Sequence, residues 1–343
     1  MTKSEITNLF KILSLEEQQE VLKELNQINI KENISFIKSR GEALDNKKGN
    51  CPHCNSINYV KFGIDKGSKR YRCKDCKKTF TEYTGTWMAK LHKKELILPY
   101  LELMRQEKSL DAIKSELGIN KKTAFDWRHK VLASLEEVGK DKFTGITESD
   151  ETFFLQSYKG SRKLERKPYK RGRKVGKKGI SKDHVAVIAT KGRAEGLDLT
   201  VATLGRIKKQ DIKNALEERV DGKTVLCSDG HVSYKGFAKD LQIEHHVIRG
   251  DLKEYVKNKK YHIQHINSLH NGIKKWIDNR FWGVSTKYLQ KYMNWYRIKE
   301  QLKDSANYIA DFTKLSMVDT TSNERYYRIT EDYLKLLHIS MPS

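Results

Sequence analysis

Four cysteines in two close pairs constrain the fold of this chain more than any other feature of its sequence. Two residues separate Cys51 from Cys54, 18 residues follow, and Cys73 and Cys76 repeat the first spacing. Two cysteines at this spacing can bind one tetrahedral ion from a tight turn, and a hairpin can bring two such turns together. The pattern therefore predicts a four-thiolate zinc site within a zinc ribbon at residues 49–84.

Free thiols and disulfides are the alternatives to zinc. Unbound cysteines would have no need of the doubled spacing. Disulfides are disfavoured because the first residues, Met-Thr-Lys-Ser-Glu, lead into charged sequence without the apolar core of an export signal. Zinc would supply folding free energy that so short a segment cannot obtain from apolar burial. We expect Tyr71 and Phe80 to pack over the site and Cys227, alone in an apolar run, to be a buried filler.

The chain is strongly basic. It has 67 Lys and Arg against 44 Asp and Glu, a formal net charge of +23 over 343 residues. Such a surplus indicates a polyanionic partner, most simply nucleic acid, although a soluble basic protein has the same composition. No apolar run approaches the ~20 residues that cross a bilayer, so we expect no membrane span. The length favours two or more folded units.

A helix-turn-helix is expected within the helical segment 87–140. Gly118 suits the left-handed position that ends one helix, and Asn120 can cap the next. Any pair of helices joined by a short turn can imitate this layout, so the basic context decides the interpretation. The side chains expected to contact DNA lie near the start of the second helix: Lys121, Lys122, Thr123 and Arg128.

From residue 145 onward, short β-rich runs alternate with helices. This alternation predicts an α/β domain at 145–300, a mixed sheet flanked by helices. The expected strands are 146–158, 183–190, 197–204, 223–229 and 244–249, and the expected helices include 208–219, 232–241 and 261–276. A helical segment at 1–48, with Ser14 and Glu17 as a capping box, precedes the ribbon, and a helical tail at 301–343 ends the chain. The stripe Leu289, Tyr292, Met293 and Tyr296 is expected to be buried.

Two aspartates and one helix face suggest a site in this domain. Asp150 lies in the first β-rich run, and Asp229 ends the fourth run just before Gly230, a position that commonly faces the cleft outside a sheet. Helical spacing places Asn267, His270, Asn271 and Lys274 on one face. Two carboxylates and an amide oxygen suit Mg²⁺ or Mn²⁺, ions that promote phosphodiester cleavage. Aspartates that only cap turns, and a helix face that is only solvated, are the alternatives.

The motifs taken together resemble those of a known family. Ser149-Asp150-Glu151-Thr152, the run S-D-G-H-x-S-Y from residue 228, the helix at 261–276 and the run G-V-S-T-K-Y-L from residue 283 occur here in one order after the ribbon. They are similar to bacterial insertion-sequence transposases of the DDE type. The likeness is closest to the zinc-ribbon group that has Asn as the third active-site residue, with Lys seven residues later. It covers about residues 50–300 and implies an RNase H-like catalytic domain.

The resemblance implies the roles of individual residues. Asp150, Asp229 and Asn267 match the catalytic residues that hold Mg²⁺ or Mn²⁺, and Lys274 matches the basic residue that follows. Asn267 stands where many DDE enzymes carry Glu, and an amide binds a divalent ion less strongly than a carboxylate. Glu151 is a rival ligand, but side chains alternate along a strand, so we expect only one of Asp150 and Glu151 to face the site.

The implied function is that of a DNA transposase. Such an enzyme binds insertion-sequence ends, cleaves them to free 3′-hydroxyls and joins them to target DNA by two-metal transesterification. Double-stranded DNA is the implied partner, a homodimer assembled on DNA the implied state, and a cytoplasmic, nucleoid-associated location is expected. The alternatives are a DNA-binding regulator with an inactive RNase H-like domain and a metal-dependent nuclease that never joins strands.

A basic insertion at 160–182 separates the strand that carries Asp150 from the next strand. Residues 162–182 contain eleven Lys and Arg and one Glu. A solvated loop is the simplest interpretation of the free protein, but its place in the chain would put it beside the site. We therefore expect Lys170, Arg171, Arg173 and Lys174 to contact the DNA backbone.

Overall fold

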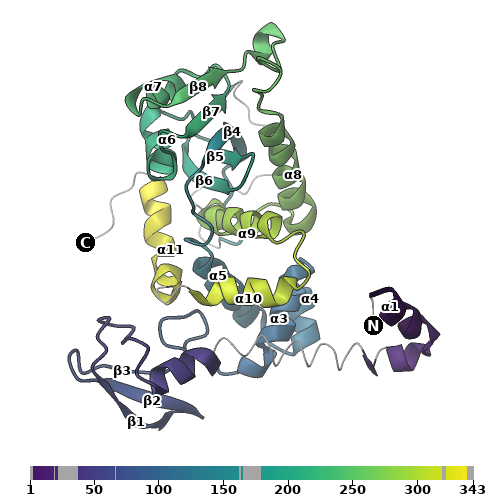
Figure 1. Cartoon of the computed structure of the whole chain (residues 1–343), viewed down its shortest axis with the longest axis vertical. Coiled ribbons are helices and arrows are strands. Elements are labelled where there is room, and N and C mark those ends of the chain that lie inside the picture. The colour runs from purple at the N-terminus through teal and green to yellow at the C-terminus, as the bar shows by residue number, and fades with distance from the viewer. Residues whose placement is uncertain are drawn as a thin grey trace. The chain divides into compact units, whose positions relative to one another are not determined.

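The computed structural model describes residues 3–18, 20–21, 38–65, 67–161, 164, 179–318 and 322–337. The chain forms two compact units (Figure 1). The first contains Met1–Gln106 and Ser305–Thr320, and the second contains Glu107–Asp304 and Thr321–Ser343. The helical segment expected at 87–140 is thus divided between them. No helix in the described residues is both long and apolar enough to cross a bilayer.

The first unit contains the cysteine-bearing sheet and several helices. Its elements are α1 (Lys3–Ile12), β1 (Tyr59–Asp65), β2 (Ser68–Cys73), β3 (Thr79–Phe80), the 3-10 helix η1 (Lys94–Leu96), α3 (Ile97–Arg105) and α10 (Tyr308–Val318). The three strands form an antiparallel sheet in the order β1-β2-β3. Tyr71 stacks on Phe80 with ring centroids 5.6 Å apart, and both rings are buried as expected.

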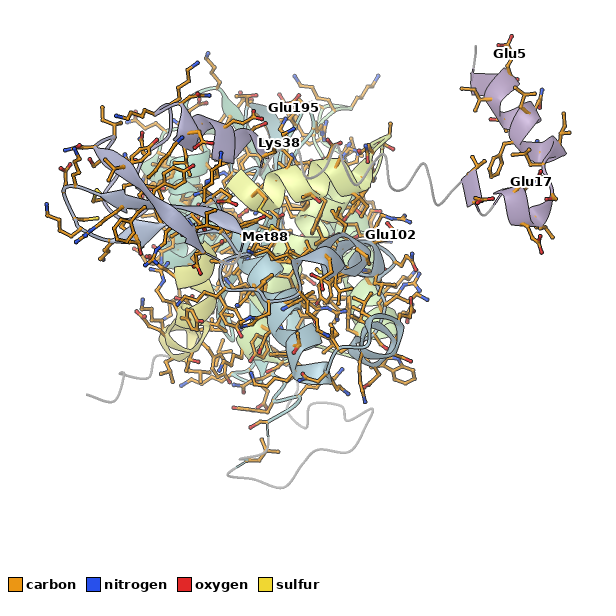
Figure 2. The ribbon with its side chains drawn as sticks, turned by 90° about the horizontal axis from the view of Figure 1, so that it is seen from below. Glu5, Glu17, Lys38, Met88, Glu102 and Glu195 are labelled. Atoms are coloured by element: carbon orange, nitrogen blue, oxygen red, sulfur yellow. The ribbon has the colours of Figure 1, made fainter. Side chains whose placement is uncertain are left out.

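The expected capping box near the N-terminus is present. The backbone N–H of Ser14 donates to Oε2 of Glu17 at 2.8 Å, and the N–H of Glu17 donates to Oγ of Ser14 at 3.3 Å. Figure 2 shows Glu17 on the helical turn that follows α1, which carries Glu5. The reciprocal bonds satisfy two backbone donors that a helix start leaves unpaired.

The second unit is built on a five-stranded sheet. Its strands are β4 (Gly145–Leu155), β5 (His184–Gly192), β6 (Leu197–Leu204), β7 (Thr224–Ser228) and β8 (Glu244–Val247). Its α-helices are α4 (Leu110–Leu117), α5 (Lys121–Ser134), α6 (Lys209–Leu216), α7 (Val232–Asp240), α8 (Gln264–Phe281), α9 (Leu289–Gln301) and α11 (Ser322–Leu336). Three 3-10 helices complete it: η2 (Glu217–Arg219), η3 (Gly250–Leu252) and η4 (Thr286–Tyr288).

The sheet is mixed, in the order β6-β5-β4-β7-β8. The pairs β6–β5 and β5–β4 are antiparallel, and the pairs β4–β7 and β7–β8 are parallel. All five expected strands form. Helices α6 and α7 lie on one side of the sheet and α8 on the other (Figure 1). Helix α8 packs against β4 and β5, and α9 packs against β6.

The core lies on both faces of the sheet because β-strand side chains alternate. On the face covered by α6 and α7, buried apolar residues include Ile188, Ile212, Leu226 and Phe237. Cys227 points to the opposite face, where it is fully buried with Ile248 and Tyr261, as expected of a filler. The predicted stripe on α9 is likewise buried: Leu289, Tyr292, Met293 and Tyr296 are at most 7% exposed.

Local signals set several helix ends. Gly118 ends α4 with a φ of 61°, and the Asn120 side chain accepts from the N–H of Thr123 at 2.7 Å, so both predicted roles are confirmed. Helix α8 begins three residues later and ends five residues later than the expected 261–276. At its C-terminus the ammonium of Lys159 donates to the carbonyls of residues 281, 282 and 283, which have no helical partner.

Candidate active site and metal centres

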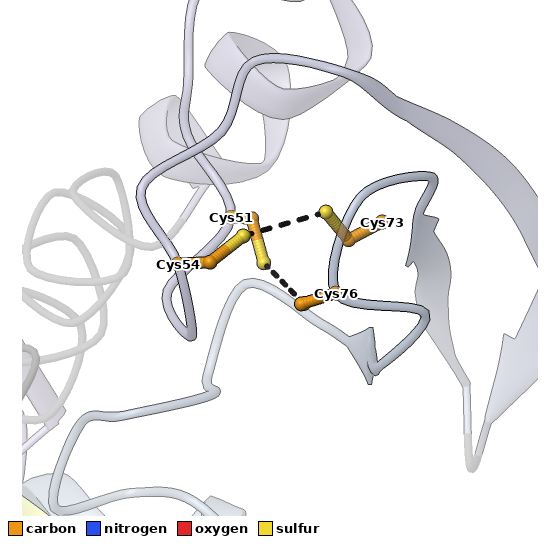
Figure 3. Close-up of side chains that lie close together, drawn as sticks. All are labelled: Cys51, Cys54, Cys73 and Cys76. Carbon is orange, nitrogen blue, oxygen red and sulfur yellow. Dashed lines mark hydrogen bonds between the residues drawn. The ribbon is translucent and has the colours of Figure 1, made fainter.

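The four cysteines form one cluster (Figure 3). The Sγ atoms of Cys51 and Cys76 are 3.7 Å apart, those of Cys54 and Cys73 are 3.6 Å apart, and all four lie within 4.8 Å of one another. A tetrahedral zinc ion with Zn–S bonds of about 2.3 Å places its sulfurs about 3.8 Å apart. Burial raises the pKa of the Cys51 thiol to about 12, so a cation is needed to hold it as a thiolate. The cluster fits zinc and a zinc ribbon.

Three carboxylates meet at one edge of the second unit's sheet. Asp150 and Glu151 lie on β4, and Asp229 follows the last residue of β7. Their carboxylate oxygens lie within 4.8 Å of one another. Strand β4 pairs with β7 only as far as Glu148. The next residues of β4 therefore extend past the carboxyl end of its parallel neighbour, which is where Asp229 emerges.

The expectation that only one of Asp150 and Glu151 would reach this site is wrong. The backbone does alternate: Asp150 lies on the α8 side, where its Oδ2 is 3.9 Å from Nδ1 of His270. Ser149 lies on the α7 side, where its Oγ is 3.4 Å from the Tyr234 hydroxyl. Because Glu151 has no β7 residue beside it, its longer side chain can reach around the open edge of the strand to the same point.

Burial and mutual repulsion perturb these carboxylates. Burial, with the charges of Glu151 and Asp229 adding to it, raises the pKa of Asp150 to about 8. Burial and the charge of Asp229 raise the pKa of Glu151 to about 7. Oε2 of Glu151 is buried and has no hydrogen-bond partner within the described part of the chain. A divalent cation would relieve both conditions, so the cluster fits Mg²⁺ or Mn²⁺.

Asn267 and Asp229 line the same cavity. It has a volume of about 570 Å³, and its wall includes Arg249, Tyr255 and Gln264. Asn267 lies on the exposed surface of α8, in its first turns. Asn267 thus shares a cavity with Asp229, whereas Asp150 and Glu151 are not among the residues that line it.

His270 and Lys274 follow Asn267 along α8. Burial lowers the pKa of His270 to about 4, and the charge of Lys274 adds to the effect, so the imidazole is neutral at pH 7. The charge of Lys274 also opposes the rise in the pKa of Asp150. The predicted helix face is thus electrostatically coupled to the carboxylates on the sheet.

One buried acid near the site was missed by the sequence analysis. Glu148 is fully buried and lies two residues before Asp150, on the same face of β4. Its carboxylate contacts Arg193, His262 and His265. The only sequence signal for Glu148 was its position two residues before Asp150, which places both side chains on one face of a strand. Its partners come from segments far along the chain, and the sequence does not show that these segments meet.

The residues predicted to contact DNA differ in their exposure to solvent. Lys121 and Lys122 are exposed at the start of α5, paired with Asp111 at 2.8 Å and with Asp126 at 2.7 Å. Thr123 is partly exposed beside them, and its N–H donates to the Asn120 cap. Lys170, Arg171, Arg173 and Lys174 lie outside the described residues.

Arg128 does not face outward, so its prediction as a DNA contact is corrected. Its side chain is 2% exposed and donates to the carbonyl of Lys108 at 2.7 Å. The guanidinium lies 5.5 Å from the ring centroid of Trp295. Position 128 follows Ala124 by four residues, which places it on the buried face of α5 rather than beside the exposed lysines.

A comparison with protein families finds a likeness over the segment that holds the carboxylates. Residues 142–297 match the ISXO2-like transposase domain. The matched transposase domain spans the whole five-stranded sheet together with α8, and it includes Asp150, Asp229, Asn267 and Lys274.

Two further likenesses were found. The chain is 25% identical over 260 residues to an uncharacterized protein in transposable element ISH50 of Halobacterium salinarum, over 74% of this chain and 85% of that protein. The crystal structure of a pre-cleavage Mos1 transpososome matches 71% of this chain and 81% of the solved chain with 9% identity and a TM-score of 0.25. The second likeness is too distant for any inference about this chain.

Proposed function

We propose that this chain is a DNA transposase that cleaves insertion-sequence ends and joins the freed 3′-hydroxyls to target DNA. The observation that carries the proposal is the convergence of Asp150, Glu151 and Asp229 within a segment that matches a transposase domain. The central position of β4 in a mixed sheet supports the expected RNase H-like fold.

The proposed metal ligands are Asp150, Asp229 and Asn267, with Glu151 as a further carboxylate. Bound Mg²⁺ or Mn²⁺ would activate the attacking oxygen and stabilise the leaving oxygen of the scissile phosphate. The neutral imidazole of His270 lies beside Asp150, with its Nδ1 3.9 Å from Oδ2. Lys274 supplies a positive charge near the carboxylates, where it favours the approach of a phosphate.

DNA binding is assigned to the basic segments outside the carboxylate cluster. Lys121, Lys122 and Thr123 begin the second helix of the proposed helix-turn-helix, and the insertion at 160–182 would contact the backbone beside the site. The zinc ribbon would hold its shape around one structural Zn²⁺. Because two transposon ends must be held together, we propose a homodimer assembled on DNA at the nucleoid.

The proposal can be tested by measuring metal-dependent cleavage of DNA duplexes whose sequences are those of the genomic flanks of the gene. Asp150→Asn and Asp229→Asn should abolish cleavage in Mg²⁺ while they leave DNA binding intact, because they remove ligands and not DNA contacts. Asp240→Asn is the matched control: this exposed carboxylate on α7 pairs with Lys209 at 2.8 Å, and its loss should leave cleavage unchanged.

The outcomes separate the alternatives. Binding without cleavage by the unsubstituted protein would leave a DNA-binding regulator. Cleavage without joined products would leave a nuclease. Cleavage retained in either aspartate variant would overturn the assigned site.

A further inference from the structure

We infer that Glu148 is a positioning residue: it fastens the first turn of α8 to β4 and so fixes the position of Asn267 on the cavity wall that Asp229 also lines. Oε2 of Glu148 accepts from the backbone N–H groups of His265 at 3.0 Å and Ile266 at 3.4 Å. Oε1 accepts from Nδ1 of His265 at 2.7 Å and from Nε of Arg193 at 3.0 Å.

These contacts cap two N–H groups of α8 that its own sequence leaves unpaired; the local acceptor, Nδ1 of His262, takes only the N–H of Gln264 at 3.3 Å. The first N–H groups of a helix have no partner within it, and a local side chain usually accepts from them. At the N-cap of α8 stands Ile263, whose side chain offers no acceptor. The acceptor comes instead from the sheet, 117 residues earlier in the chain. The start of α8 is therefore defined by its attachment to β4.

One hydrogen-bonded attachment and one packing contact relate the helix to the same strand. Glu148 and Asp150 are two residues apart on β4 and face the same side. Glu148 binds the amides at residues 265 and 266, and Asp150 lies 3.9 Å from His270. Asn267 lies between these two points along α8. Two separated contacts fix the rotation of a helix about its axis, and that rotation decides where the Asn267 amide points.

The remaining partners of Glu148 are cationic or tether the approach to α8. Arg193 also donates to the backbone carbonyls of Lys260 and His262, which precede the helix. Nδ1 of His262 lies 3.3 Å from the Glu148 carboxylate. The guanidinium on Oε1 already supplies the positive charge that a metal ion would bring. Although the ligand atoms of Glu148, His262 and His265 lie within 4.8 Å of one another, we therefore interpret the arrangement as a fastening of α8.

Binding of Mn²⁺ alone, measured by electron paramagnetic resonance on the full-length zinc-loaded chain without DNA, tests the inference. The inference rests on the proposed function only for the role of Asn267. The relevant Mn²⁺ site is the one whose binding Asp150→Asn abolishes. Glu148→Ala should weaken Mn²⁺ binding at this site by about 10-fold, as the loss of a residue that orients a metal ligand does. Asn267→Ala should have a similar effect. The double variant should bind Mn²⁺ with the same affinity as the weaker-binding single variant, because both substitutions act through the Asn267 amide.

Glu148→Gln provides rescue by a conservative change. Its amide oxygen can still accept from the backbone N–H groups, so Mn²⁺ binding should recover most of the loss. Asp198→Asn is the matched control, since Asp198 is a buried carboxylate on β6 that pairs with Arg219 at 3.2 Å and Arg297 at 3.1 Å. This change should lower the unfolding midpoint and leave Mn²⁺ affinity unchanged.

Unaltered Mn²⁺ affinity in Glu148→Ala would overturn the inference and reduce the residue to a structural one. Additive losses in the double variant would do the same. If Glu148→Ala fails to fold, Glu148→Asp carries the comparison with Asn267→Ala, because its shorter carboxylate keeps the charge beside Arg193 but is too short to reach the N–H groups of His265 and Ile266. Mn²⁺ binding with the expected coupling in a chain that cuts no DNA would instead overturn the proposed function and leave this inference standing.

Discussion

At the scale of single residues, the clustered acids make the stability of the metal-free chain depend on pH. Asp150 and Glu151 have pKa values of about 8 and about 7 in the folded chain, well above the values of about 4 in an unfolded chain. The folded state thus binds more protons across this window. The contribution of these two groups to stability is therefore fully present below about pH 4 and is lost as the pH rises toward 8.

Asp150→Asn removes the more perturbed of these two groups. In metal-depleted buffer, its unfolding midpoint relative to the unsubstituted chain should rise between about pH 5 and about pH 8. Thermal denaturation followed by circular dichroism measures the difference. Asp240→Asn should show no such rise, because Lys209 lowers the pKa of Asp240. A constant difference for Asp150→Asn would mean that the cluster does not raise its pKa.

Arg128 and Lys122 allow stability to be separated from DNA binding on one helix. Arg128→Ala leaves the Lys108 carbonyl without its donor and should lower the free energy of unfolding by about 1–3 kcal/mol. Lys122 is 83% exposed, so Lys122→Ala should leave stability unchanged and reduce the salt slope of DNA binding by about 1. Urea unfolding and binding titrations at several salt concentrations measure the two effects. The reverse result would restore Arg128 as a DNA contact.

The sequence identified residues whose chemistry is visible in short motifs and missed those whose role depends on distant partners. Gly118, Asn120 and the cysteine cluster follow from local spacing, and the structure has them as expected. Glu148 is recognisable only once α8 is docked on β4. The reach of Glu151 depends on where β7 ends, and the burial of Arg128 depends on rings contributed by α8 and α9.

At the scale of elements, the three-stranded sheet of the proposed zinc ribbon should fold only with bound metal. Tyr59, Tyr71 and Phe80 give the three-stranded sheet a very small apolar core, and zinc binding supplies the missing folding free energy. Cys73→Ser should therefore lose bound zinc and hydrogen-exchange protection across β1 and β2. Metal analysis and exchange measured by mass spectrometry give the two readouts.

Cys227→Ala is the matched control for the ribbon. Cys227 is buried beside Ile248 and Tyr261 and is not part of the cysteine cluster. Its loss should cost stability in the second unit only and should leave the zinc content at the level of the unsubstituted chain. Full zinc content in Cys73→Ser would contradict a four-thiolate site.

All five strands of the second unit follow from apolar patterning, because each run is short and bounded by polar sequence. Both ends of α8 differ from the expected ones, because side chains outside the helix set them: Glu148 accepts from its first N–H groups, and Lys159 donates to its last carbonyls. Neither contact has a local signature. Strand order also required the structure, because parallel pairing of β7 with β4 is a non-local choice.

At the scale of the whole molecule, the net charge should dominate the affinity for DNA. The slope of log affinity against log salt concentration should become less steep when Lys170, Arg171, Arg173 and Lys174 are replaced by Gln. The change should be up to about 3–4 in total, since each lost phosphate contact contributes about 0.9. Replacement of the exposed α7 lysines Lys235 and Lys239 is the control and should change the slope little. An unchanged slope in the fourfold variant would show that the insertion does not contact the backbone.

The alternation of side chains along β4 also governs which changes in chain length this fold can accept. One residue added between Gly145 and Glu148 would shift the register of β4, so Glu148 and Asp150 would both turn from the α8 side to the α7 side. Residues gained or lost beyond Leu155, where β4 has ended, leave that register intact. Natural variation in length should therefore accumulate after the strand and be absent within it.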